Sequence, residues 1–87
     1  MKELTMFMMP GCPHCKLAIK LQDELMANHP EYKDIPIVMI DETKEKKLAD
    51  QYDYYYVPCY FMGDQKLFEG HAEKSDVETV FKKALEA

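Results

Sequence analysis

The feature that most constrains this chain is a pair of cysteines, Cys12 and Cys15, placed where one residue pattern gives way to another. The segment Leu4–Met8 before them is nearly continuous in apolar residues, as expected of a central strand covered on both faces. From Pro13 to about Asn28, apolar residues recur at helical spacing. Two cysteines three residues apart at a strand-to-helix junction are typical of a thiol–disulfide redox site.

The expected start of the helix gives the two thiols different roles. If Cys12 is the N-cap, Pro13 occupies the first helical position, where its missing N–H costs nothing. The Cys12 sulfur then faces free N–H groups and the positive end of the helix dipole, which favour the thiolate. Such surroundings lower a cysteine pKa from about 8.5 to between about 3.5 and 7.5. We predict Cys12 as the nucleophile and Cys15, one turn further and directed inward, as the resolving thiol.

His14 lies between the two cysteines and is predicted to tune them. A protonated or hydrogen-bonding imidazole would stabilise the Cys12 thiolate, and with it the reduced form, which makes the disulfide a stronger oxidant. The alternative interpretation is an exposed histidine of the first turn with no special role.

Composition limits the other possibilities. The 87 residues form one domain, 1–87, large enough for a modest core. A net charge of −5 and the lack of a basic patch argue against nucleic acid as a partner. No apolar run approaches the length of a membrane span, so no membrane contact is expected. The N-terminus shows no cleavable signal pattern, and three cysteines suggest working thiols, so we expect the protein in the reducing cytoplasm. We also expect a monomer.

The rest of the chain extends the pattern to β-α-β-α-β-β-α. A second strand is expected at Ile35–Ile40, and the intervening helix predicts a parallel crossover. A helix is expected from Asp41 to about Gln51, followed by an antiparallel hairpin of Val57–Met62 and Lys66–Glu69 around Gly63. The last helix is expected to begin with a capping box of Ser75 and Glu78. Its buried side is expected to consist of Val77, Val80, Phe81 and Leu85.

Three segments together resemble the thioredoxin superfamily and, in size and layout, its small glutaredoxin-like members. These segments are Cys12-Pro13-His14-Cys15 after an N-terminal strand, Val57-Pro58 at the start of the third strand, and Gly70 followed by Lys74 and Val77. The resemblance spans essentially the whole chain. It implies an α/β fold of the thioredoxin type, with a four-stranded mixed sheet and helices on both faces.

The resemblance also implies roles for residues outside the cysteine pair. Pro58 would be a cis-proline beside the active-site sulfurs, and it joins Pro13 and His14 as a tuning residue. Gly11, Val57 and Tyr56 would contact the substrate or glutathione, with the Val57 backbone pairing with an extended chain by strand addition. The chain departs from thioredoxins at Gly11, where they carry a tryptophan, and at Met6, where they carry a buried aspartate.

The predicted function is that of an enzyme, a cytoplasmic dithiol–disulfide oxidoreductase of the glutaredoxin or thioredoxin type. It would act in electron transport and cell redox homeostasis by reducing protein or low-molecular-weight disulfides through a Cys12–Cys15 pair. No bound cofactor and no metal is expected. The electron donor is left open between glutathione and a flavoenzyme of the thioredoxin-reductase type.

Cys59 leaves an alternative open. It follows Pro58 directly and can be interpreted as a small buried hydrophobe, as a third redox thiol, or as a third ligand beside Cys12 and Cys15. In the last case the chain would be a metal or iron–sulfur binding protein, since thiolates suit zinc, copper(I) and iron–sulfur clusters. A redox-inactive binding module is a third class, which the two intact cysteines disfavour.

Overall fold

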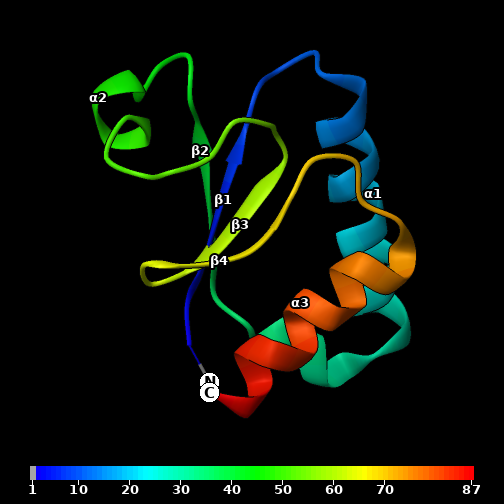
Figure 1. The fold of residues 1–87 in the computed structure, drawn as a ribbon. Coiled ribbons are helices and arrows are strands. Elements are labelled where there is room, and N and C mark those ends of the chain that lie inside the picture. Colours follow the sequence, from blue (N-terminus) through cyan, green and yellow to red (C-terminus); the bar gives the residue numbers. More distant parts are fainter. Residues whose placement is uncertain (1) are drawn as a thin grey trace.

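The computed structural model describes residues 2–87, and its strands form one mixed sheet in the order β2-β1-β3-β4 (Figure 1). The elements are β1 (Leu4–Met8), α1 (Pro13–Asn28), the 3-10 helix η1 (Pro30–Asp34), β2 (Ile37–Asp41), α2 (Lys46–Ala49), β3 (Cys59–Met62), β4 (Gln65–Glu69) and α3 (Lys74–Glu86). β1 is parallel to β2 and antiparallel to β3, and β3 is antiparallel to β4. The predicted element order and mixed four-stranded sheet are confirmed. Among residues 2–87 no helix combines the length and apolar character needed to cross a membrane.

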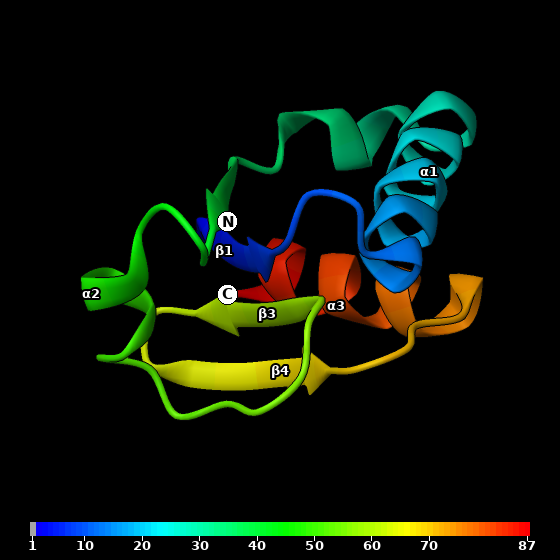
Figure 2. The same cartoon turned by 90° about the horizontal axis from the view of Figure 1, so that it is seen from above.

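The two faces of the sheet are covered unequally. Alternate residues of a strand point to opposite faces, and Met6 and Tyr60 accordingly enter a large core with α1 and α3. Phe7 and Phe61 enter a smaller cluster on the other face, where Ala49 of α2 and the tyrosines after it contribute. In both views α1 and α3 are neighbours, and α2 lies across the strands from α1 (Figures 1 and 2).

The first strand and first helix match the predicted bounds, because each carries an uninterrupted pattern. The buried residues of α1 are Cys15, Ala18, Leu21, Gln22 and Leu25. Ile19 and Met26 are half-buried at the edge of this core. Gln22 is the unexpected member of the buried row, since its amide Nε2 donates to the Tyr60 hydroxyl at 2.6 Å and to Met6 Sδ at 3.1 Å.

The second helix is much shorter than the prediction from Asp41 to about Gln51. It comprises only Lys46–Ala49. Asp41 belongs to the end of β2, and its carboxylate accepts hydrogen bonds from the Thr43 N–H at 2.9 Å and the Thr43 hydroxyl at 2.6 Å. Aspartate that bonds the backbone two residues later makes a turn that competes with helix. The acids interpreted as a helix start are therefore a turn.

The prolines delay two strands relative to the predicted bounds. β2 begins at Ile37 and β3 at Cys59. Proline has no N–H for the ladder, so Pro36 and Pro58 lie just outside the strands. The Val57–Pro58 peptide bond is cis, as the resemblance implied.

The last helix is capped by a different pair from Ser75 and Glu78. Its N-cap is Glu73, whose N–H donates to the Asp76 carboxylate at 2.9 Å while the Glu73 side chain accepts from the N–H of residue 76. Glu78 instead accepts a hydrogen bond from the Tyr32 hydroxyl at 2.8 Å. The capping prediction was wrong by two residues because two candidate capping pairs with the same spacing, Glu73–Asp76 and Ser75–Glu78, overlap in the sequence. Val77, Val80 and Phe81 are buried as predicted, whereas Leu85 is half-buried.

Candidate active site

A tight turn after β1 delivers Cys12 to the start of α1. The Cys12 N–H donates to the Met9 carbonyl at 3.2 Å, and Gly11 has φ +84°. Proline followed by a glycine of positive φ is the pattern of a type II turn, here with Pro10 and Gly11 at its centre. A Cβ on Gly11 would meet no atom within 4 Å, so the backbone conformation, and not space, favours glycine.

Cys12 and Pro13 occupy the helix positions that the sequence predicted. Cys12 is the N-cap in an extended conformation, Pro13 opens the helix, and the Cys12 carbonyl accepts the N–H of Lys16 at 3.0 Å. The first turn of α1 carries no acidic residue that would oppose a thiolate at this helix end. Cys12 is partly exposed, whereas Cys15 is buried, and both are free thiols.

The two thiols differ in acidity. The pKa of Cys12 is lowered, mainly because the Cys15 backbone N–H donates to its sulfur, with further help from the Cys15 thiol and the His14 backbone N–H. Burial and, to a smaller extent, the charge of Glu42 act against this shift. Burial raises the pKa of Cys15 to about 11, and the neighbouring Cys12 adds to the rise. The pair therefore combines a partly exposed thiol of lowered pKa with a buried thiol of raised pKa one turn away.

The segment with Pro58 lies beside the hairpin and is fixed by main-chain contacts. Pro58 is buried, and its carbonyl accepts the N–H of Gly70 at 2.9 Å. Val57 is half-buried against the smaller cluster, and Tyr56 is 68% exposed. The resemblance implied substrate contacts for Val57 and Tyr56 and a tuning role for Pro58.

Glu69, at the end of β4, secures this segment and was not predicted to do so. One of its carboxylate oxygens accepts the N–H groups of Tyr55 at 2.8 Å and Tyr56 at 3.1 Å. The other accepts Lys66 Nζ at 2.6 Å. The Lys66 ammonium, followed by the two N–H groups, lowers the pKa of Glu69 to about 2. In the sequence, Glu69 is an ordinary acid at a strand end, and nothing there indicates its distant partners.

His14, in the first turn of α1, contacts His71, which follows β4. Their Nδ1 atoms are 3.0 Å apart, and their rings are nearly perpendicular, at 81° with centroids 5.1 Å apart. The Nε2 atom of His71 contacts Glu73 Oε1 at 3.0 Å. No sequence pattern assigns His71 a role, because 57 positions separate it from His14. The only available hint was its place after a hairpin that begins beside Pro58.

Cys59 is fully buried on the face of the sheet away from α1, with Phe7, Ala49 and Phe61. Burial raises its pKa to about 12. Within residues 2–87, no three or more His, Cys, Asp or Glu side chains are grouped as ligands for a metal ion. The structure therefore does not bring Cys59 together with Cys12 and Cys15 as a ligand set.

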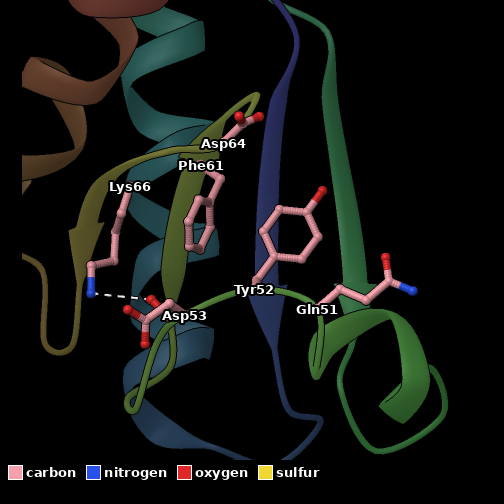
Figure 3. A pocket seen from close by; sticks show the side chains of 6 residues that line it. All are labelled: Gln51, Tyr52, Asp53, Phe61, Asp64 and Lys66. Carbon is pink, nitrogen blue, oxygen red and sulfur yellow. Dashed lines mark hydrogen bonds between the residues drawn. The ribbon is translucent and has the colours of Figure 1, made fainter.

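An open hollow of about 450 Å³ lies on the side of the smaller cluster (Figure 3). Its lining consists of Gln51, Tyr52, Asp53, Phe61, Asp64 and Lys66. Lys66 Nζ donates to the Asp53 carbonyl at 3.3 Å along its rim. None of the lining residues is a cysteine, so this hollow is separate from the dithiol.

Solved structures with a similar arrangement of strands and helices include thioredoxin domains. The chain accordingly has a thioredoxin-like fold. A malarial protein superposes with a TM-score of 0.68 at 20% identity, covering 94% of each chain. Thioredoxin O2 from Arabidopsis thaliana, in its oxidized state, matches with a TM-score of 0.57 at 20% identity over 93% of this chain and 72% of its own. The first two thioredoxin domains of Naumovozyma dairenensis Eps1p match with 0.58 at 17% identity over 95% of this chain and 34% of theirs. No protein-family model and no curated protein sequence matches the chain.

Proposed function

We propose that this chain is a dithiol–disulfide oxidoreductase that reduces protein or low-molecular-weight disulfides in the cytoplasm, as a monomer acting in electron transport and cell redox homeostasis. One observation carries the proposal. A partly exposed Cys12 with a lowered pKa lies one helical turn from a buried Cys15 whose pKa is raised to about 11. A thiolate is the species that attacks disulfides, and a nearby protected thiol completes the exchange.

The proposed cycle begins at the Cys12 thiolate. It attacks one sulfur of the substrate disulfide, forms a mixed disulfide, and expels the other substrate sulfur as a thiolate, which takes a proton from water. Cys15 then loses its proton and attacks the Cys12 sulfur. The Cys12–Cys15 disulfide forms and the second substrate thiol leaves, so two electrons and two protons have passed to the substrate.

The contacts of Cys15 explain why it acts second. Besides burial, its pKa is raised by its hydrogen bond to Cys12 and by the charge of Cys12. Once Cys12 is part of a mixed disulfide, its sulfur carries no charge and both of these causes vanish. The resolving thiol thus becomes more acidic at the step that needs its thiolate.

The substrate groove in this proposal lies beside Val57 and Pro58. Glu69 already occupies the N–H groups of Tyr55 and Tyr56, so strand addition would use the Val57 backbone, with Gly11 and the exposed Tyr56 side chain at the edges. Electrons return from an external donor, either glutathione or a flavoenzyme of the thioredoxin-reductase type, and no bound cofactor takes part.

The test is turnover of a disulfide substrate by matched cysteine variants. Cys12→Ser is expected to abolish turnover above the uncatalysed rate. Cys15→Ser is expected to stop after one event, with the substrate trapped on Cys12, which intact-mass spectrometry detects. Cys59→Ser is the matched control, because it removes a buried thiol on the other face and is expected to retain turnover.

Two results would contradict the proposal. One is full turnover by Cys12→Ser. The other is a wild-type protein whose thiols resist alkylation until a chelator is added, which would favour the metal or iron–sulfur hypothesis. That hypothesis would then need ligands beyond Cys12 and Cys15, since Cys59 faces the smaller cluster.

A further inference from the structure

The contact between His14 and His71 joins two elements far apart in the sequence. His14 belongs to the first turn of α1, and His71 to the segment between β4 and α3. The two Nδ1 atoms are 3.0 Å apart, and Glu73 Oε1 lies 3.0 Å from the far nitrogen of His71. The three side chains thus form a continuous row from the α3 cap to the first turn of α1.

The segment that carries His71 is fixed on both sides. Before it, Gly70 adopts φ +95° and donates its N–H to the Pro58 carbonyl at 2.9 Å. After it, Ala72 is 1% exposed in the main core, and Glu73 caps α3 through Asp76. The contacts of Gly70, Ala72 and Glu73 therefore fix the backbone on either side of His71, whose side chain contacts α1.

The hydrogen-bond pattern selects one tautomer for each neutral ring. A carboxylate only accepts, so the His71 Nε2 atom carries its hydrogen and donates to Glu73. The Nδ1 atom of His71 is then an acceptor, and the His14 Nδ1 atom must donate across the 3.0 Å contact. The Nε2 atom of His14 then carries no hydrogen and is an acceptor.

The Cys12 sulfur obtains its hydrogen bonds from other groups. Those that lower its pKa are the Cys15 backbone N–H, the Cys15 thiol and the His14 backbone N–H. The main chain of His14 thus serves Cys12, while its imidazole is engaged by His71.

We propose that His71, braced by Glu73, is a positioning residue that holds the His14 imidazole toward the β4–α3 segment and away from the Cys12 thiolate. Its effect on the dithiol rests on the proposed function. An imidazole released from His71 adds a donor for the Cys12 thiolate, which stabilises the reduced form. His71 therefore keeps the Cys12–Cys15 disulfide a weaker oxidant than the motif alone would make it.

Imidazole nitrogen NMR tests the positioning directly, whether or not the protein turns over disulfides. In the reduced wild type, His14 is expected as the Nδ1–H tautomer and His71 as the Nε2–H tautomer. His71→Ala is expected to convert His14 to the Nε2–H form. His29→Ala is the matched control, because His29 is also an exposed histidine beside a glutamate, at the other end of α1. A His14 signal unchanged by His71→Ala would overturn the inference.

Equilibration with glutathione buffers tests the consequence for the dithiol. His71→Ala is expected to shift the equilibrium toward the dithiol by about tenfold, equivalent to one unit in the Cys12 pKa. In a His14→Asn background the same substitution is expected to change the equilibrium by less than about twofold, because His71 acts through His14. An equal shift in both backgrounds, or none in either, would overturn the inference. A wild type that forms no Cys12–Cys15 disulfide would instead contradict the proposed function, and the tautomer result would still decide the positioning.

Discussion

The two faces of the sheet each bury a cysteine, yet only one of these cysteines belongs to the dithiol. Cys15 lies on α1, which covers the larger core, and Cys59 lies in the smaller cluster with Phe7 and Phe61. Burial raises the pKa of both, to about 11 for Cys15 and about 12 for Cys59. Burial and acidity therefore do not distinguish them. The difference lies in the neighbour, since Cys15 is one helical turn from Cys12 and contacts it.

The two faces of the sheet also differ in the elements that cover them. The α1 and α3 face is built from helix rows that continue for several turns, with Leu25, Val77 and Phe81 almost fully buried. The other face is covered by Ala49 of the four-residue helix α2 and by the half-buried Tyr52 and Tyr54. The helical face thus carries both cysteines of the dithiol at the start of α1, whereas the thinner face carries the segment that leads to Pro58.

The largest expected effect is on stability and contrasts the two faces. Phe81→Ala empties a fully buried site and is expected to lower the free energy of unfolding by about 3–5 kcal/mol. Tyr52→Ala removes ring contacts with Phe7 and Phe61 and is expected to cost about 1–3 kcal/mol, since each aromatic pair contributes about 0.5–1.5 kcal/mol. Urea unfolding measures both, with the 83% exposed Tyr55 as control, where Ala changes stability by about 0.5 kcal/mol or less. Equal losses for Phe81→Ala and Tyr52→Ala would remove the contrast.

Where local pattern decides the structure, the sequence was sufficient. The bounds of β1 and α1 and the N-cap position of Cys12 follow from an apolar run, a helical period and Pro13. The second helix was mispredicted because the side chain of Asp41 bonds Thr43 and makes a turn, which helix-start patterns do not distinguish from a cap.

The sequence does not predict the contacts of several polar residues, for a different reason. Gln22, Glu69 and His71 each act through partners many positions away, such as Tyr60, Tyr55 and His14. Each would be an ordinary exposed polar residue if only its neighbours in sequence were considered. Their roles depend on how β3, β4 and the following segment approach α1, which no local period encodes.

The next effect concerns how the alkylation rates of the three thiols depend on pH. Because the pKa of Cys12 is lowered, its alkylation rate is expected to reach half of its maximum below pH 9, the ordinary value. Cys15 is expected to stay slow until the pH approaches about 11, and Cys59 until about 12. Peptide mass spectrometry after timed iodoacetamide treatment resolves the three sites. Alkylation of Cys59 as fast as that of Cys12 at pH 8 would show that the thinner face opens readily.

The same raised pKa values predict a loss of stability at alkaline pH. A thiol whose folded pKa is raised contributes stability that is complete below the unfolded pKa, near 9, and is lost as the pH rises through the folded value. The reduced protein is therefore expected to lose stability between pH 9 and about 11–12. Cys59→Ala removes one of the two groups and is expected to flatten this loss, measured by urea unfolding at several pH values.

The smallest expected effect concerns Glu69, which binds the backbone of Tyr55 and Tyr56 to the end of β4. Its pKa is lowered to about 2, first by Lys66 and then by the Tyr55 and Tyr56 N–H groups. A lowered carboxyl pKa contributes stability that is present above the ordinary value of 4.5 and is lost as the pH falls through about 2. Glu69→Gln is therefore expected to be less stable than wild type near neutral pH, by a difference that shrinks as the pH falls through that range.

Amide hydrogen exchange locates this effect. Glu69→Gln is expected to expose the N–H groups of Tyr55 and Tyr56 to faster exchange, whereas Lys66→Met leaves both of their bonds to Glu69 in place and is expected to have a smaller effect. A difference in stability that does not change with pH would contradict the role of the Glu69 charge. Faster exchange at these two amides with an unchanged Cys12 alkylation rate would mean that the thinner face loosens independently of α1, because the groups that lower the Cys12 pKa belong to α1 itself.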